Sequence, residues 1–487
     1  MPATVARRTD GETPRQRLAR RPDRGAVGRL VVVAVVCVLA WWAVRTFGRP
    51  YNFFDMKIYY GAVAWWANGN DLYAFIAPRT TLGFTYPPFA GLVMLPMAVL
   101  PLGGAAWINM VGSLLALTVI LTALLRPLAD RMGWSLPFTV ALAVPLAAAL
   151  EPARETLGYG QVNLLLFALI FADLIALRWR AGRHPRAAAQ RAGGARSVGG
   201  PLRRFFFSGA WAGVGIGLAT AIKLTPALFI VHLLITRQWR AAATAVGTAL
   251  GVTIGTFAVA GAESTAYFTS VLWDTGRVGA ADMTPNQSLA GVLARLYDSV
   301  ETPGLLYLAF AVLLLAVGLS RAAGAHADGD ELTAFTLVGL TANVISPISW
   351  SHHLVFVIPA VIVLADAAIR RRAASRGLRR PANAPAGLSA VGGLRSPIWY
   401  PALTGFRHAA AAVALYLLFL VSPIWPYEHQ LPAESHYQDG LFGALMENSL
   451  AIGLIVLVAA LPWRPGAEPV FYAEQHRVSR PVPLIRS

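Results

Sequence analysis

The chain has 487 residues, of which 56% are hydrophobic and only 13% are charged, and its formal net charge is +17. Soluble domains carry about 25% charged residues, so the composition excludes an ordinary soluble protein. The positive charge does not require a nucleic-acid partner, because basic residues collect in the cytoplasmic loops of membrane proteins. Cys37 is the only cysteine, which excludes a disulfide within the chain and a cysteine-based metal site.

Long apolar runs recur along the whole chain, and they predict an all-α polytopic membrane protein. The runs are continuous, unlike the short alternating segments of a membrane β-barrel. About 12 transmembrane helices are expected, with soft boundaries because polar residues interrupt several runs. They lie near residues 28–47, 105–126, 136–151, 161–179, 206–222, 224–236, 241–260, 303–321, 331–346, 353–369, 406–423 and 441–461.

The bundle is predicted to occupy residues 28–462. A basic, polar tail, residues 1–27, precedes it and is expected to be disordered and cytoplasmic. A second cytoplasmic tail, 463–487, follows the last span. Between the first two spans, residues 48–104 are predicted to form an outer loop with juxtamembrane helices.

The distribution of basic residues predicts the orientation of the bundle. With both termini in the cytoplasm, 33 of the 41 lysines and arginines fall on the cytoplasmic side, as the positive-inside rule requires. Many lie in 180–205 and 370–405, which are predicted to be flexible cytoplasmic loops. The apolar segment 87–104 is predicted to lie at the outer surface, because a crossing there would place Arg126 and Arg131 outside.

Polar motifs that neither spans nor basic loops explain all fall on the predicted outer side. In chain order, they are "YNFFDMK" with Asp55 and Lys57, "GFTYPPF" with Tyr86, "EPARETLGYGQVN" with Arg154, Tyr159, Gln161 and Asn163, "AIKLTP" with Lys223, "TPNQS" with Asn286 and Gln287, and "SPISWSHH" with Trp350, His352 and His353. Ionised groups near lipid are costly and mark functional sites. The pattern therefore predicts one site at the outer membrane face, assembled from several loops.

Simpler interpretations exist for these residues. Asp55 also fits a solvated loop acid, and Lys57 fits a side chain that reaches toward lipid head groups. Lys223 also fits an anchor at a helix end, and Arg154 also fits an ion pair with Glu155.

Metal binding is not predicted for the outer motifs. The adjacent residues His352 and His353 would point about 100° apart on a helix, which argues against a chelating pair. No dense carboxylate cluster of the kind that Mg²⁺ requires is evident. No cofactor is therefore expected, with a divalent metal left open.

The aspartate after the first span, "GFTYPPF", "GYGQVN", "AIKLTPALF", "NQS" and "SPISWSHH", in this order, resemble a known family. They are similar to the bacterial polyprenyl-phosphomannose-dependent α-(1→2)-mannosyltransferases of the GT-C superfamily, over a stretch from about Asp55 to about Pro359. The resemblance implies a GT-C type bundle with outer-surface helices after the first span. It also implies a plasma-membrane enzyme of an actinobacterial cell envelope, which builds phosphatidylinositol mannosides, lipomannan and lipoarabinomannan.

The resemblance further implies a polyprenyl-phosphate-mannose donor, a mannolipid or lipoglycan acceptor, and Asp55 as catalytic base in an inverting transfer. The donor phosphate is expected to be bound by Lys223, His352, His353 and Arg154. Sugars of the donor or acceptor are expected to contact Lys57, Tyr86, Tyr159, Gln161, Asn163, Asn286, Gln287 and Trp350. The acceptor is further expected along 261–300 and 424–440.

Two alternatives stay open at this point. One is a polyprenyl-phosphoarabinose-dependent arabinofuranosyltransferase, a related enzyme with another donor. The other is a flippase or transporter of lipid-linked sugars, which would require polar residues deep in the spans and broken helices in paired halves.

Overall fold

The computed structural model describes residues 24–193, 200, 205–297, 301–377, 405–426 and 440–468. These residues form helices and connecting turns, with two isolated β-bridges and no strand among them. The predicted all-α architecture is confirmed for this part of the chain. Most of the predicted tails, the centres of the two basic loops and much of 424–440 lie outside the described residues.

The helices follow one another closely along the chain. They are α1 (Arg24–Phe47), α2 (Phe54–Ala67), η2 (Leu72–Ala74), α3 (Pro88–Met94), η3 (Leu95–Val99), α4 (Leu102–Met132), α5 (Leu136–Ala149), α6 (Glu151–Tyr159), α7 (Asn163–Gly193), α9 (Val214–Ile222), α10 (Ala227–Ile235), α11 (Trp239–Val259), α12 (Gly261–Thr269), η4 (Val271–Trp273), η5 (Thr275–Val278), α13 (Leu289–Leu296), α14 (Gly304–Ala327), α15 (Glu331–Ile345), η6 (Ser351–His353), α16 (Val357–Gly377), α18 (Phe406–Val421), α20 (Gly440–Glu447) and α21 (Ser449–Ala460).

Each of the twelve predicted spans overlaps a helix, but fewer of these helices have the length and composition of a membrane span. In the described part of the chain, five helices are long and apolar enough by length and composition: α1, α4, α11, α14 and α18. The bent pairs α5–α6 and α20–α21 raise the number to seven. A protein that spans the membrane several times is thus supported, whereas the count of twelve is not.

The hairpin of α9 and α10 differs most from the prediction. Each helix has nine residues and is therefore about 14 Å long, which is less than half of the hydrocarbon core of a bilayer. Residues 207–213, which begin the first of these two apolar runs, form turns instead of a regular helix. The break at Lys223–Pro226 therefore lies at the tip of a short hairpin and does not connect two full spans.

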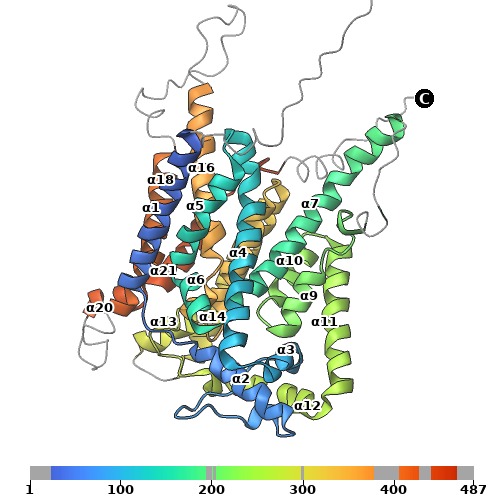
Figure 1. The fold of residues 1–487 in the computed structure, drawn as a ribbon, viewed down its shortest axis with the longest axis vertical. Coiled ribbons are helices and arrows are strands. Elements are labelled where there is room, and N and C mark those ends of the chain that lie inside the picture. The colour runs from blue at the N-terminus through green and yellow to red at the C-terminus, as the bar shows by residue number, and fades with distance from the viewer. Residues whose placement is uncertain are drawn as a thin grey trace, which may run out of the picture.

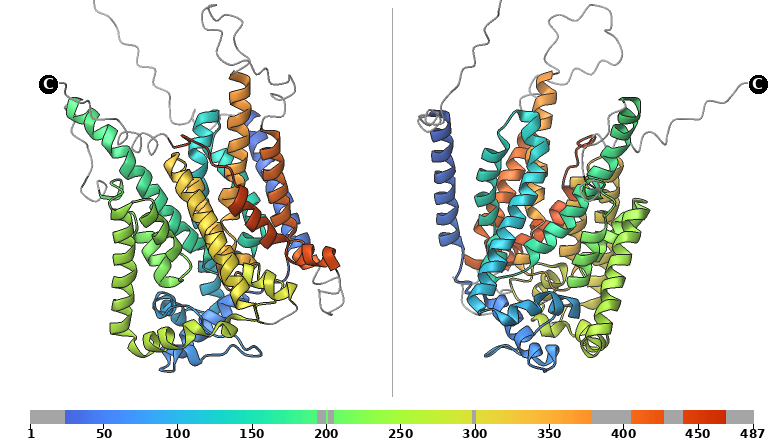
Figure 2. Two further views of the ribbon diagram at one scale, coloured as in Figure 1. Left: turned by 180° about the vertical axis from the view of Figure 1, so that it is seen from behind. Right: turned by 45° about the vertical axis from the view of Figure 1, so that its right-hand side comes forward.

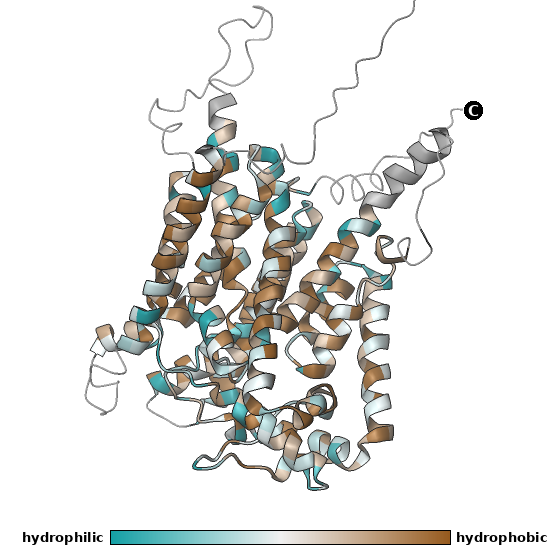
Figure 3. Ribbon diagram, viewed as in Figure 1, coloured by the Kyte–Doolittle hydropathy of each residue, from teal (hydrophilic) through white to brown (hydrophobic). Residues whose placement is uncertain are grey.

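The two ends of the bundle differ in architecture (Figures 1 and 2). At the lower end in Figure 1, the short helices α2, α3 and α12 form a layer beneath the long helices. At the upper end lie the start of α1, the turn between α4 and α5, and the far end of α7. Figure 3 shows hydrophobic residues along the long helices and hydrophilic residues concentrated toward both ends.

Aromatic rings in the core fix the α9–α10 hairpin to the rest of the bundle. Phe229 of α10 lies 5.4 Å from Phe335 of α15 and 5.6 Å from Phe356, measured between ring centroids. Phe356 in turn packs against Phe167 of α7 at 5.3 Å. These rings are almost fully buried, so the tip of the hairpin has a defined position.

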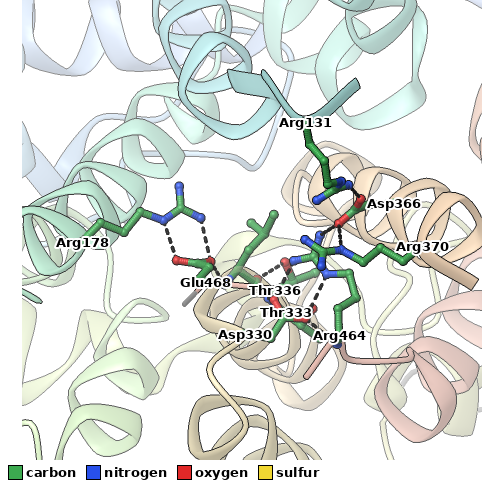
Figure 4. Close-up of polar contacts among 10 residues, drawn as sticks. Arg131, Arg178, Asp330, Thr333, Thr336, Asp366, Arg370, Arg464 and Glu468 are labelled. Atoms are coloured by element: carbon green, nitrogen blue, oxygen red, sulfur yellow. Dashed lines mark hydrogen bonds and ion pairs between the residues drawn. The ribbon is translucent and has the colours of Figure 1, made fainter. Parts of the chain in front are cut away.

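A network of buried ion pairs closes the upper end of the bundle (Figure 4). Arg464, in the segment after α21, bonds Asp330 through Nη2 at 2.6 Å and through Nε at 2.9 Å, and its Nη1 lies 2.8 Å from Asp366. Asp366 also pairs with Arg131 and Arg370. Residues 463–468, which the sequence assigned to the C-terminal tail, are therefore anchored to α15 and α16.

Replacing Arg464 with methionine should destabilise the protein strongly, because Asp330 would remain buried without its ionic partner. Removing one member of a buried pair costs about 3–5 kcal/mol. The unfolding temperature of the detergent-solubilised protein should fall markedly. In the control Arg370→Met, the lost side chain is 30% exposed, and such pairs contribute about 0–1 kcal/mol. Equal losses in the two variants would contradict the anchoring role of Arg464.

Candidate active site

A cavity of about 720 Å³ opens at the lower end of the bundle. Its walls come from the start of α2, the loop before α3, the end of α6, the tip of the α9–α10 hairpin, the segment 267–285 and the loop 346–353. Segments that are far apart in sequence therefore meet at one place. Eight of the thirteen predicted site residues line this cavity: Asp55, Tyr86, Tyr159, Gln161, Lys223, Trp350, His352 and His353.

Asp55 occupies the first turn of α2, and a docked turn holds it there. The preceding residues Asn52 and Phe53 have positive φ angles of 49° and 51°, and Phe53 N donates to the carbonyl of Gly158 at 3.0 Å. A Cβ at position 158 would lie only 2.3 Å from the Tyr51 ring. Glycine in "GYGQVN" is thus required for the close approach that brings Asp55 beside α6.

Gln161 links Asp55 to two tyrosines. Its Nε2 donates to Asp55 Oδ2 at 2.9 Å, and its Oε1 accepts from the Tyr86 hydroxyl at 3.1 Å. The hydroxyls of Tyr86 and Tyr59 are a further 3.1 Å apart. The amide orientation of Gln161 is therefore fixed by a donor on one side and an acceptor on the other, which holds the Asp55 carboxylate in position.

Burial raises the pKa of Asp55 to about 6, although the hydrogen bond from Gln161 and the positive charges of Lys223 and Arg49 oppose the shift. A carboxylate is a more effective general base when its pKa lies nearer to the working pH. Asp55 thus combines a fixed position with the basicity that proton abstraction requires.

Lys223 lies at the tip of the α9–α10 hairpin. Its Nζ donates to Asn163 Oδ1 at 3.2 Å and lies 5.4 Å from the centroid of the Tyr86 ring. Burial lowers the pKa of Lys223 to about 7, while the charge of Asp55 opposes this shift. Asn163 does not line the large cavity, but it positions the lysine that does.

His352 and His353 meet in the loop after α15, with ring centroids 4.6 Å apart and planes at 88°. Burial, and next the positive charge of Lys223, hold the pKa of both imidazoles well below the usual range. Trp350 N donates to Nδ1 of His353 at 3.2 Å, which assigns the ring proton to Nε2. At neutral pH these residues therefore offer neutral hydrogen-bonding groups.

Arg154 does not reach the cavity, contrary to its expected contact with the donor phosphate. Its guanidinium donates to the carbonyls of Phe47 at 3.0 Å and Leu420 at 2.5 Å, and it pairs with Glu151. Arg154 is therefore a buried clamp that joins the end of α1 to α6 and α18.

Three other predicted residues also lie away from the cavity lining. Lys57 is exposed on α2. Asn286 is buried and accepts from Ser349 N at 2.9 Å. Gln287 donates to the carbonyl of Glu447 at 2.7 Å. The "NQS" motif thus braces the loop 346–353 and the last helices, and does not contribute its amides to the cavity.

Four charged residues that were not predicted as site residues line the cavity: Arg49, Glu155, Asp274 and Arg277. Arg49 follows α1, donates to the Tyr159 hydroxyl, and has Nη2 3.2 Å from Glu155 Oε1. Its guanidinium carbon lies 3.2 Å from the Trp425 ring centroid. The sequence did hold a signal for the two arginines. Only 8 of the 41 lysines and arginines fall on the predicted outer side, and Arg49 and Arg277 are two of these rare outer basic residues.

A metal site is not evident in the described ranges of the chain, because no three histidine, cysteine or acidic side chains there are grouped to hold an ion. The cavity instead combines three carboxylates, several cations and aromatic rings. Such a lining can move a proton, stabilise a phosphate and contact sugar rings.

Comparison with known proteins agrees with this chemistry. The model of glycosyltransferase family 87 matches residues 84–347. A protein of Mycolicibacterium smegmatis, named polyprenol-phosphate-mannose-dependent alpha-(1-2)-phosphatidylinositol mannoside mannosyltransferase, is 32% identical over 374 residues, which cover 71% of this chain and 76% of that protein. A Mycobacterium tuberculosis protein named for the corresponding pentamannoside is 32% identical over 364 residues, covering 73% and 75%.

Among solved structures, ArnT from Cupriavidus metallidurans bound to undecaprenyl phosphate is similar with a TM-score of 0.37 and 15% identity, covering 93% of this chain and 80% of that one. The family assignment does not depend on this distant likeness. It follows from the family match, which spans more than half of the chain, and from the two relatives. The chain belongs to glycosyltransferase family 87.

Proposed function

We propose that this protein transfers mannose from a polyprenyl-phosphate-mannose donor to a phosphatidylinositol mannoside or a related lipoglycan, forming an α-(1→2) linkage with inversion. The names of the relatives support the donor and the acceptor. The observation that carries the proposal is the Asp55–Gln161 hydrogen bond inside a cavity that also holds Lys223 and Arg49.

Asp55 is the general base of the proposed reaction. A β-linked donor gives an α-linked product in one displacement, so a single base suffices and no covalent intermediate on the enzyme is needed. Asp55 takes the proton from the acceptor 2-hydroxyl as that oxygen bonds to the anomeric carbon. The bond from the anomeric carbon to the phosphate oxygen breaks at the same time, and polyprenyl phosphate leaves.

Lys223 and Arg49 stabilise the leaving phosphate. The donor phosphodiester becomes a phosphomonoester, so negative charge grows on it in the transition state. Cations aimed at growing charge lower the barrier more than they stabilise the bound substrate. Neutral His352 and His353 add hydrogen bonds next to this charge. Tyr86, Tyr159 and Trp350 offer rings and hydroxyls to the sugars, while Gln161 fixes the base.

The cavity end of the bundle faces the exterior in this proposal. The ends of α7 and α16 and the start of α18, which adjoin the basic segments, lie at the opposite end (Figure 1). The positive-inside rule then places that opposite end and both termini in the cytoplasm. The bundle is of the GT-C type, residues 28–462 act as one catalytic unit, and α2 and α3 lie on the outer membrane surface.

Changing Asp55 to asparagine should reduce mannose transfer by about 100- to 10,000-fold, the usual contribution of a positioned general base. Product formation is measured by mass spectrometry with mannosyl-phosphopolyprenol and a mannolipid acceptor. Asp71→Asn, the same change at an exposed position after α2, serves as control and should keep its activity. Normal transfer by Asp55→Asn would remove this residue from the mechanism. Transfer from an arabinosyl donor alone would instead identify the protein as an arabinofuranosyltransferase.

The pH profile of kcat/KM should be bell-shaped. Activity rises as Asp55, with its pKa raised to about 6, loses its proton, and it falls as Lys223, with its pKa lowered to about 7, loses its charge. Lys223→Arg keeps the positive charge at high pH and should extend the alkaline side of the profile while leaving the acidic side in place. An alkaline side that is unchanged in Lys223→Arg would show that Lys223 does not set it.

Arg49→Gln should weaken binding of the product polyprenyl phosphate, because hydrogen bonds to charged groups contribute about 1.5–3 kcal/mol. The inhibition constant of polyprenyl phosphate should therefore rise by about 10- to 100-fold, and Arg49→Lys should restore part of the loss. An unchanged inhibition constant in Arg49→Gln would place the phosphate elsewhere in the cavity.

A further inference from the structure

The cations of the cavity fall into two sets. Lys223 and Arg49 lie near Asp55, since their charges stabilise its ionised form. Arg277 comes from η5, on a wall built by the loop 79–85 and the segment 267–283. One Nη of Arg277 donates to the carbonyl of Tyr73, which fixes its guanidinium to this second wall.

Arg277 has no evident structural partner for its charge. Among the residues that the structure describes, no carboxylate lies within ion-pair distance of it. A partly buried guanidinium without a counter-ion is costly, and hydrogen-bonding groups of a ligand can lower that cost. The fixed fork of arginine donors suits a pair of adjacent hydroxyls as well as an anion.

The second wall carries polar and aromatic groups among apolar side chains that include Leu82, Leu272 and Met283. Thr80 and Thr81 line it from the loop before α3, Asp274 lines it from the turn before η5, and Tyr267 adds a ring. Gly83 of "GFTYPPF" packs closely against the backbone of Phe75 and against Arg277. A Cβ at position 83 would lie 2.4 Å from the Phe75 carbonyl oxygen and 3.2 Å from Arg277 Nη2, so glycine permits this close contact. Hydroxyls, a carboxylate, a guanidinium and a ring together are a lining that fits a sugar.

Inversion determines which substrate meets this wall. The incoming hydroxyl and the leaving phosphate must lie on opposite sides of the anomeric carbon. If Lys223 and Arg49 hold the phosphate, the acceptor reaches Asp55 through a part of the cavity that these two cations do not line, and the second wall is such a part. The cavity has the size of typical small-ligand sites, so only the terminal sugars of a long acceptor enter it.

We infer that Arg277, with Thr80, Thr81 and Asp274, forms a subsite for the second sugar of the acceptor, counted from the mannose that is extended. The inference rests on the proposed function. It makes the enzyme specific for acceptors with at least two sugars at their free end, whatever lipid anchors the other end. Arg277 is a specificity-determining residue that does not touch the reacting atoms.

The test compares two synthetic acceptors, an octyl α-mannoside and an octyl α-dimannoside, with mannosyl-phosphopolyprenol as donor. The wild-type enzyme should prefer the dimannoside. Arg277→Gln should lower the ratio of kcat/KM for the dimannoside to kcat/KM for the monomannoside by about tenfold, because hydrogen bonds to a charged group are lost. Because both values come from the same preparation, partial unfolding of the variant cancels in the ratio.

Arg79→Gln is the matched control, since Arg79 is an exposed arginine of the same loop and does not line the cavity; it should leave the ratio unchanged. If Arg277→Gln lowers both kcat/KM values equally and raises the KM of the donor, Arg277 binds the donor phosphate and the inference is overturned. A ratio equal to that of the wild type overturns it as well. If the wild-type enzyme transfers no mannose to either acceptor, the proposed function itself fails.

Discussion

The hydrogen bond between Gln161 and Asp55 is the interaction on which the site depends. It crosses from the turn after α6 to the first turn of α2 and so ties the lower layer of short helices to the bundle. An ionised carboxylate in such a buried place requires a partner that favours its charge without neutralising it permanently. The neutral amide of Gln161 meets this requirement, and the hydrogen bond from the Tyr86 hydroxyl to Gln161 Oε1 prevents the amide from flipping.

The need to stabilise the ionised Asp55 carboxylate also explains why two cations lie near it. Lys223 is held at the tip of a hairpin whose helices are too short to cross the membrane, and the aromatic core fixes the depth of that tip. Burial of its amine lowers the pKa of Lys223 to about 7, so the side chain loses its positive charge as the pH rises above neutral. Arg49 reaches the cavity from the end of the first long helix, where Glu155, Tyr159 and Trp425 hold it. The Asp55 carboxylate and the two cations thus come from separate elements that meet at one end of the protein.

Much of this arrangement could be predicted from the sequence. Apolar runs marked the long helices of the bundle but not α6, α12 and α13, and polar residues in otherwise apolar surroundings marked eight of the residues that line the cavity. The failures have physical causes. Arg154 bonds a carbonyl 266 residues away, and no local pattern indicates such a contact. The side chains of Asn286 and Gln287 hydrogen-bond buried backbone groups, Ser349 N and the Glu447 carbonyl, and therefore serve the fold of the loops instead of the cavity. Arg49 resembles any basic residue at the end of a span. Phe229 of α10 packs against Phe335 and Phe356, and no local pattern brings these distant rings together.

The anchored segment after α21 limits how the C-terminal part of the protein can be altered. Glu468 accepts from Arg178 at 2.7 Å and from Leu332 N at 3.1 Å, so this segment joins α7 to the beginning of α15. A fusion partner or affinity tag attached beyond Glu468 leaves these contacts intact. Shortening the chain to before Arg464 would instead leave the buried Asp330 without its ionic partner, at the end of the bundle opposite the cavity.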